Sequence, residues 1–139
     1  MWGSVSLAHG VAVRVYTSFS AVVEAVKGCD IYSSVYIEVV DSSPKIAVAV
    51  GEKYFFRVDN YLAITVIAID RSDYVVLKTV ATGGRKGLLS FLDYEASRDC
   101  AVEVVDSVCR ALKAKCEAVA EVSYLEQLQV KPAKGLSHR

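Results

Sequence analysis

The sequence has 139 residues, of which 53% are hydrophobic and 23% are charged, and it contains only 2 prolines. This length suits one domain with a sizeable core, and the composition excludes an intrinsically disordered chain. Sixteen basic and sixteen acidic residues give a formal net charge of +0, so the general attraction of a basic domain to nucleic acids or anionic membranes is absent. The N-terminus lacks the pattern of a signal peptide, and no run approaches the roughly 18 apolar residues of a membrane span. We therefore expect a cytoplasmic, soluble protein that has neither a membrane nor nucleic acid as a partner.

The first two predicted elements are a strand and a short helix. From Val5 to Tyr16 apolar and polar residues alternate, with a break at Gly10 that indicates a bulge or a bend. Thr17 or Ser18 can cap the helix that follows, in which apolar residues recur at helical spacing. Gly28 supplies a C-terminal stop for this helix.

Five strands are predicted next, separated by short turns. The first runs to Val40 and ends at the turn signal Asp41 to Pro44. The other four are expected at Ile46 to Val50, Tyr54 to Val58, Tyr61 to Ile69 and Tyr74 to Ala81. The turns between them are expected at Gly51-Glu52, Asp59-Asn60 and Asp70 to Asp73. Such short connections predict antiparallel neighbours, because a parallel crossover needs about a dozen residues or more.

Some of these strands are apolar on both faces. The segment Leu62 to Ile69 is interrupted only by Thr65, whereas a strand with one wet face alternates more cleanly. The aromatic run Tyr54, Phe55, Phe56 must also divide between the two faces, because strand side chains alternate. Both faces of the sheet are therefore predicted to be dry, one covered by helix and the other by a ligand or a second subunit.

A glycine-rich stretch, TVATGGRKGLLSF, follows the last of these strands. Successive glycine amides can form an anion-binding concavity, to which two basic side chains would add charge. A plain turn that uses the positive φ of glycine explains the same glycines and is the favoured interpretation. The candidate ligand or anion-binding residues are Gly83, Gly84, Arg85, Lys86 and Gly87.

The final predicted element is a long helix from Glu95 to about Tyr124. Its apolar residues recur at steps of three or four and must lie on the sheet. Residues 125–139 form a partly disordered basic tail that follows a single domain of residues 1–124.

Four cysteines are present, and three of them fall on the predicted long helix. Cys109 and Cys116 would then be roughly 10 Å apart along the helix axis, too far for a disulfide bond. A bond from Cys29 to one of the three stays open, but buried free thiols are favoured.

The order of elements predicts an α+β fold. An antiparallel sheet of about five or six strands should carry a short N-terminal helix and a long C-terminal helix on one face. With the stretches KYFFRVDNYLAITVIAID and TVATGGRKGLLSF before the terminal helix, the sequence resembles small uncharacterised proteins of the START-like, helix-grip type. That resemblance implies a space between sheet and helix that can enclose an apolar ligand, and it brings no catalytic residues. The apolar face candidates are Tyr54, Phe56, Val105 and Leu112.

Motifs of catalysis and metal binding are lacking. The only histidines are His9 and His138, and no CxxC, HExxH or GxSxG pattern occurs, so we expect neither catalytic residues, nor a metal, nor a cofactor. The leading hypothesis is a noncatalytic domain that binds a small, largely apolar ligand between the sheet and the C-terminal helix. The alternatives are a self-associating interaction module, most simply a homodimer, and a phosphate or nucleotide binder that uses the glycine-rich turn.

Overall fold

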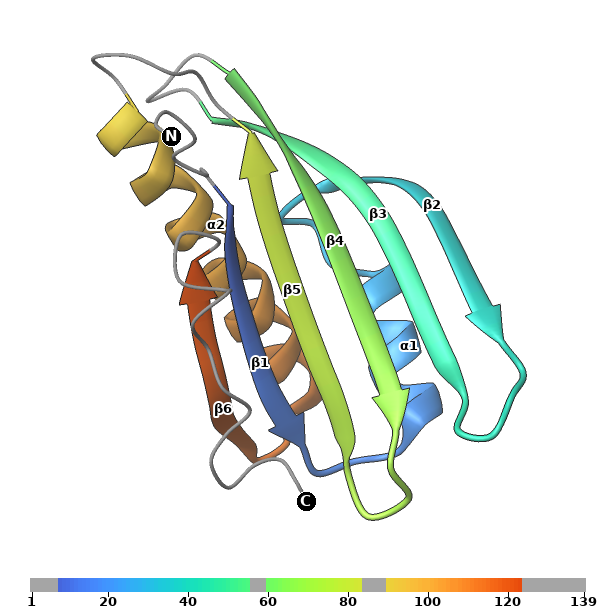
Figure 1. Ribbon diagram of the computed structural model, residues 1–139. Helices are drawn as coiled ribbons and strands as arrows, with labels where there is room; N and C mark the ends of the chain where they lie inside the picture. Colours follow the sequence, from blue (N-terminus) through green and yellow to red (C-terminus); the bar gives the residue numbers. More distant parts are fainter. Residues whose placement is uncertain (1–7, 56–59, 84–89, 124–139) are drawn as a thin grey trace.

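The computed structural model describes residues 8–55, 60–83 and 90–123 and shows an α+β fold, as predicted (Figure 1). The elements in chain order are β1 (His9–Val15), α1 (Phe19–Lys27), β2 (Ser33–Val40), β3 (Ile46–Phe55), β4 (Asn60–Asp70), β5 (Val75–Gly83), α2 (Ser90–Leu112) and β6 (Cys116–Ser123).

The strands form one six-stranded sheet in the order β2-β3-β4-β5-β1-β6, in which every neighbouring pair is antiparallel. The turns predicted at Asp41 to Pro44 and Asp70 to Asp73 are confirmed as the connections β2–β3 and β4–β5. In the second turn Ser72 has a φ of 72°, and its backbone N–H donates to Asp70 Oδ1 at 2.9 Å. Aspartate at this position caps its own turn, which is why the turn could be read from the sequence.

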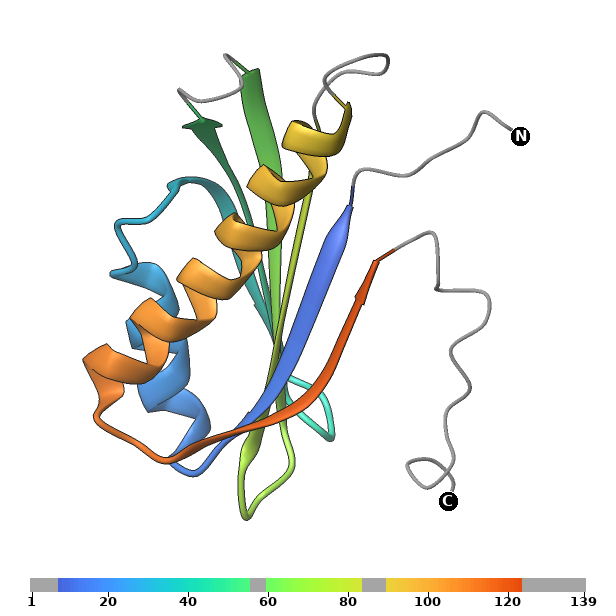
Figure 2. The same cartoon turned by 90° about the vertical axis from the view of Figure 1, so that its left-hand side faces the viewer.

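Both helices pack on the same face of the sheet, which we call the inner face (Figure 2). Alternate residues of β1 and β5 meet the buried side of α2 there, those of β4 contact α1, and many of these residues have less than 2% of their surface exposed. The largest of these fully buried side chains are Leu62, Ile64, Leu77, Val15, Val22, Val66, Val75, Val104 and Val108. The core is therefore made mainly of β-branched and leucine side chains between the sheet and two helices.

Helix α1 begins and ends where the sequence predicts. The Ser18 side chain accepts a hydrogen bond from the Ala21 N–H at 3.2 Å, and the Gly28 N–H donates to the Glu24 carbonyl oxygen at 3.0 Å. These two contacts satisfy backbone groups that the helix itself leaves without partners.

Two predicted irregularities in the strands are wrong. No turn occurs at Gly51-Glu52, because β3 continues through both residues and Gly51 pairs with Ser34 and Ile64. A Cβ atom on Gly51 would lie 2.4 Å from Cδ2 of Tyr32, so glycine serves close packing here and not chain reversal. The irregularity of β1 lies between Ala12 and Val13, against β6, and not at Gly10.

The predicted long C-terminal helix is also wrong at its end. Helix α2 stops at Leu112, where Lys113 takes a φ of 53° and its N–H donates to the Cys109 carbonyl oxygen at 3.0 Å. The chain then reverses and forms β6 beside β1. The apolar spacing of Cys116 and Val119 imitates a continued helix, but both residues lie on this strand.

This early end of α2 overturns the prediction that Cys109 and Cys116 cannot bond. The two residues form a disulfide with a Cα–Cα distance of 6.4 Å, because one lies on the last helical turn and the other begins β6. Cys29 and Cys100 are free, and burial raises the pKa of the Cys100 thiol to about 12, which makes that thiol unreactive at neutral pH.

Replacing both Cys109 and Cys116 by serine should lower the free energy of unfolding by about 2 kcal/mol, because the unfolded chain is then no longer restricted by the bond. The loss is modest because the loop that the bond closes is short. Urea unfolding of the double variant at a fixed protein concentration measures this change. Cys29→Ser is the control for the loss of a thiol outside the disulfide, since Cys29 is half-buried at the margin of the core and its thiol lies 3.9 Å from Ser107 Oγ. Equal losses in the two variants would show that the bond contributes nothing.

Candidate functional site

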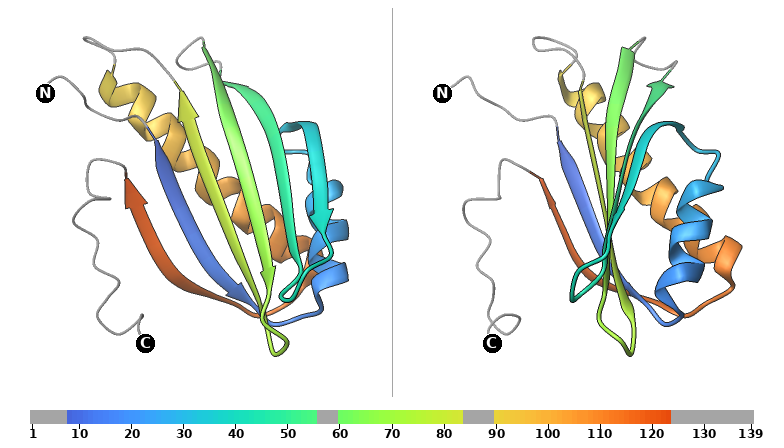
Figure 3. Two further views of the ribbon diagram at one scale, coloured as in Figure 1. Left: turned by 45° about the vertical axis from the view of Figure 1, so that its right-hand side comes forward. Right: turned by 90° about the vertical axis from the view of Figure 1, so that its right-hand side faces the viewer.

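The face of the sheet opposite the helices, which we call the outer face, is covered by no helix or strand among the described residues (Figures 2 and 3). Because the strands pair in a fixed register, the outward side chains of neighbouring strands fall into rows across the sheet. From β2 toward β6, the first row is Val40, Ile46, Ile69, Val76, Arg14 and Glu117. The second row is Glu38, Val48, Ile67, Lys78, Ala12 and Ala120. The third row begins with Tyr36, Val50, Thr65 and Val80. On β3 and β4 these rows are apolar except at Thr65.

The exposed fractions of the side chains on β4 differ between the inner and the outer face. Its inward residues Leu62, Ile64 and Val66 are at most 1% exposed, whereas its outward residues Ile67 and Ile69 are only half-buried. The inner face is therefore dry, as predicted from the apolar run of β4. A cover for the outer face stays a prediction.

Charged side chains on the outer face lie beside the apolar rows. Glu38 on β2 and Lys78 on β5 lie in the same row, with Val48 and Ile67 between them. The Tyr36 hydroxyl donates to Glu38 Oε1 at 2.6 Å, and this bond to the carboxylate raises the pKa of Tyr36.

A second charged group lies toward the β6 edge of the outer face. Both the Tyr16 hydroxyl and Arg14 Nη1 donate to Glu117 Oε1, at 2.8 Å and 3.1 Å. These two hydrogen bonds, that of Tyr16 first, lower the pKa of Glu117. Glu117 is therefore ionised and partnered, which fixes β6 against β1.

The candidates for the apolar face do not form one site. Tyr54 lies on the outer face beside Tyr61, with ring centroids 5.2 Å apart, and is 43% exposed. Val105 is buried on the inner side of α2, and Leu112 packs half-buried at the end of that helix. The candidates predicted from the sequence therefore belong to two separate layers of the fold. The remaining candidate, Phe56, lies outside the described residues.

The glycine-rich stretch is described only at its start. Gly83 ends β5 with a φ of 140°, so the predicted positive φ is confirmed there. A Cβ atom on Gly83 would lie 2.9 Å from the carbonyl oxygen of Tyr61. Gly84, Arg85, Lys86 and Gly87 lie outside the described residues, so anion binding by this stretch stays a prediction.

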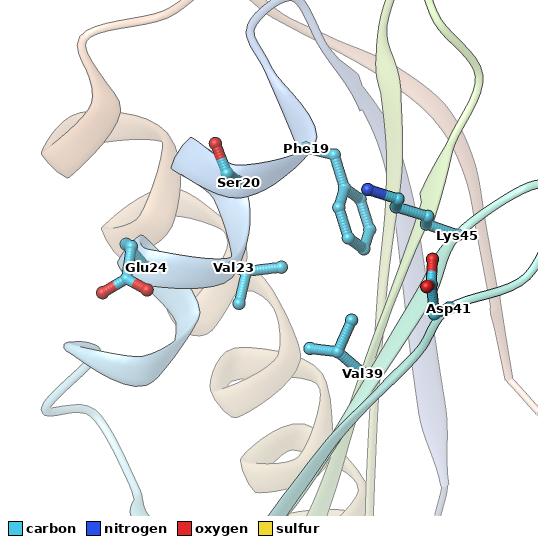
Figure 4. Close-up of a pocket in the computed structure, with 7 residues that line it drawn as sticks. All are labelled: Phe19, Ser20, Val23, Glu24, Val39, Asp41 and Lys45. Atoms are coloured by element: carbon cyan, nitrogen blue, oxygen red, sulfur yellow. The ribbon is translucent and has the colours of Figure 1, made fainter.

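Among the hollows that open on the described surface, three are well formed, and none of these three lies between the sheet and α2. The first, of about 310 Å³, lies between α1 and the end of β2 (Figure 4). The second, of about 210 Å³, lies on the outer face beside Lys78, where Gly10, Ala12 and Ala120 carry little or no side chain. The third, of about 470 Å³, lies between the two turns that follow β2 and β4.

A polar cluster that the sequence did not predict joins β1, β6 and α2. His9 is 3% exposed, and its Nε2 lies 2.7 Å from Glu121 Oε2, while Arg98 Nε lies 3.3 Å from the same oxygen. The sequence could not bring these three residues together, because Glu121 was placed on a continued helix. The cluster holds the edge strand β6 on the core and opens onto none of the three hollows.

A comparison with known protein families gives a match over most of the chain. No curated protein matches the chain. No helix in the described part of the chain is both long enough and apolar enough to cross a bilayer. Residues 11–113, which run from β1 to just past the end of α2, match DUF6054, a family of unknown function. The chain therefore belongs to the DUF6054 family.

Proposed function

We propose that the protein is a noncatalytic interaction module that forms a symmetric homodimer through its outer face. The observation that carries the proposal is the run of apolar side chains across β3, β4 and β5, on the face that neither helix covers. Large exposed apolar patches on soluble proteins typically mark interaction surfaces. A second copy is the partner that this surface fits best, for two reasons.

The first reason is that two copies can place opposite charges of the outer face against each other. A twofold axis that runs along the strands, midway between β3 and β4, places β2 of one copy over β5 of the other. Glu38 of each copy then lies over Lys78 of its partner, while Val48 of each lies over Ile67. The outer face is thus complementary to itself in both charge and apolarity, which an isologous interface requires.

The second reason is size. Four strands spaced about 4.8 Å apart and the three rows spaced about 7 Å apart give a flat footprint on the order of 400 Å². Because the side chains project from the sheet, the accessible area is larger than this footprint. The patch therefore has the size of a small, weak interface, in which each partner contributes less than about 600 Å², compared with roughly 800 Å² in a standard interface.

The two other hypotheses have less support. An apolar ligand between the sheet and α2 needs a cavity there, and the three hollows described above lie elsewhere. A phosphate or nucleotide site would use residues 84–87, which lie outside the described residues. Neither hypothesis is needed to account for the outer face.

Charge reversal tests the dimer and its axis together. Lys78→Glu and Glu38→Lys should each weaken dimerisation at least about tenfold, because two attractive contacts per dimer become repulsive. An equimolar mixture of the two variants should restore a heterodimer, since each Glu38–Lys78 contact then regains opposite charges. Analytical ultracentrifugation of the separate and mixed variants measures both effects.

The matched control is Glu103→Lys, which reverses an exposed charge on α2, away from the outer face. It should leave the dimerisation constant unchanged. The proposed interface would be wrong if the outer-face variants behaved like this control, or if their mixture did not associate more strongly than either alone.

A further inference from the structure

The two edges of the sheet are protected very differently. At β6, the disulfide fixes Cys116, and the carboxylates of Glu117 and Glu121 are held by partners on β1 and α2. At β2, four apolar or aromatic side chains are exposed, namely Val35 at 68%, Tyr36 at 54%, Val39 at 46% and Val40 at 41%. The edge at β2 is therefore the open one.

The second half of β2 has one of the usual devices that block an edge strand, the charged side chain of Glu38, and lacks the others. Natural edge strands avoid pairing with other chains by means of lysine, proline or a bulge. The one irregularity of β2 against β3 lies between Ser34 and Tyr36, near its start. From Ile37 to Val40 the strand is regular and contains neither lysine nor proline. Among the described residues no strand pairs with the outer backbone N–H and C=O groups of this segment, so they can accept a further strand.

A groove runs beside this open edge, on the side of α1. We call it the α1–β2 groove, and its volume is about 310 Å³. Phe19 and Val23 from α1 face Val39 from β2 across the groove, and Asp41 and Lys45 stand at one end (Figure 4). The groove thus has apolar walls beside a strand whose backbone can pair, the two elements of peptide recognition by strand addition.

We propose that β2 binds an extended segment of another protein, which adds to the sheet as a seventh strand. Its backbone pairs with the free edge between Ile37 and Val40, and one apolar side chain enters the α1–β2 groove beside Val39. Its alternate side chains lie on the outer side, next to Glu38. This inference does not require the proposed homodimer, because backbone pairing at β2 and the α1–β2 groove carry it, although both proposals place Glu38 beside a basic side chain.

The charge of β2 and its surroundings indicates which kind of segment can bind there. The segment from Ser33 to Asp41 contains Glu38 and Asp41 and no basic residue, and the groove adds the carboxylate of Glu24 and one basic side chain, Lys45. If two copies paired through β2, the acidic side chains of both would come together, and like charges on neighbouring strands are destabilising. A segment that alternates apolar and basic residues has the opposite charge, so we infer that the partner has this pattern.

The test uses a fluorescein-labelled peptide with the sequence Lys-Val-Lys-Leu-Lys-Val-Lys and free ends blocked. Fluorescence anisotropy with the full chain should show saturable binding. Two control peptides define the mode: one has glutamate in place of each lysine, and one carries N-methyl groups on alternate amides, which prevents strand pairing. Both controls should bind at least about tenfold more weakly. Equal binding of the N-methylated peptide, or no saturable binding of the lysine peptide, would overturn the proposal.

Two variants locate the site. Val39→Lys places a charge in the groove at an exposed position and should weaken binding of the lysine peptide at least about tenfold. Val35→Lys adds the same charge to the same strand at the irregularity, outside the groove, and should change binding less than about twofold. The proposal is overturned if both variants act equally, or if Val39→Lys abolishes self-association of the chain while peptide binding persists, which would assign β2 to a second copy.

Discussion

Replacing Leu77 by alanine should lower the free energy of unfolding by about 3 kcal/mol, within the range of about 2 to 5 kcal/mol for buried leucine. Leu77 lies in the middle of β5, its side chain is 0% exposed, and it faces the helix layer. The loss combines the transfer of apolar atoms with the cavity that the rigid strands leave. Urea unfolding followed by circular dichroism, at one protein concentration, measures it.

The control for this prediction is Val35→Ala, which removes apolar atoms from a side chain that is 68% exposed. Its effect should stay within about 0.5 kcal/mol. A loss below about 1 kcal/mol for Leu77→Ala would mean that the space between β5 and α2 is not closely packed, and it would revive the hypothesis of an apolar ligand there.

Replacing Gly51 by valine should have a comparable effect, about 3 kcal/mol. A Cβ atom at this position would lie 2.4 Å from Cδ2 of Tyr32 and 2.5 Å from the backbone oxygen of Ser33. The oxygen belongs to the start of β2, so the side chain cannot be accommodated by a rotamer change alone. The edge strand must move away from β3, which costs ladder hydrogen bonds as well as packing.

Gly28→Ala is the matched control for Gly51→Val. A Cβ atom on Gly28 would be 3.5 Å from the nearest atom, the Glu24 carbonyl oxygen, which is an ordinary contact, and the φ of Gly28 is −89°. Thermal unfolding should therefore separate the two variants clearly. If Gly51→Val were as stable as this control, β3 would not pass close to Tyr32, and the predicted turn at Gly51 would have to be reconsidered.

The sequence predicts most of the fold because its local signals agree with the tertiary structure. Alternation of side chains locates the strands, and the cap at Ser18 and the turn at Asp70 are satisfied by their own neighbours. The end of α2 could not be predicted in this way. The helical spacing of apolar residues continues past Leu112 into β6. This segment forms a strand only because it pairs with β1, which lies over 100 positions away in the sequence.

The outer face illustrates the same limit. Its apolar character is visible in the sequence, since β4 is apolar at nearly every position. The alignment of Glu38 with Lys78 is not visible, because it depends on the register of three successive strand pairs. The open edge at β2 depends similarly on the order of the strands, which places β2 and β6 at opposite ends of the sheet.

The most direct test of the proposed outer-face dimer is the molar mass of the chain in solution. Sedimentation equilibrium over protein concentrations from about 1 to 100 μM covers the range in which an interface of this size dissociates. We predict a mass that rises to twice that of the 15.1-kDa chain, and that returns to the single-chain value in the Lys78→Glu variant. A mass of 15.1 kDa for the unmodified chain at every concentration would contradict the proposed dimer.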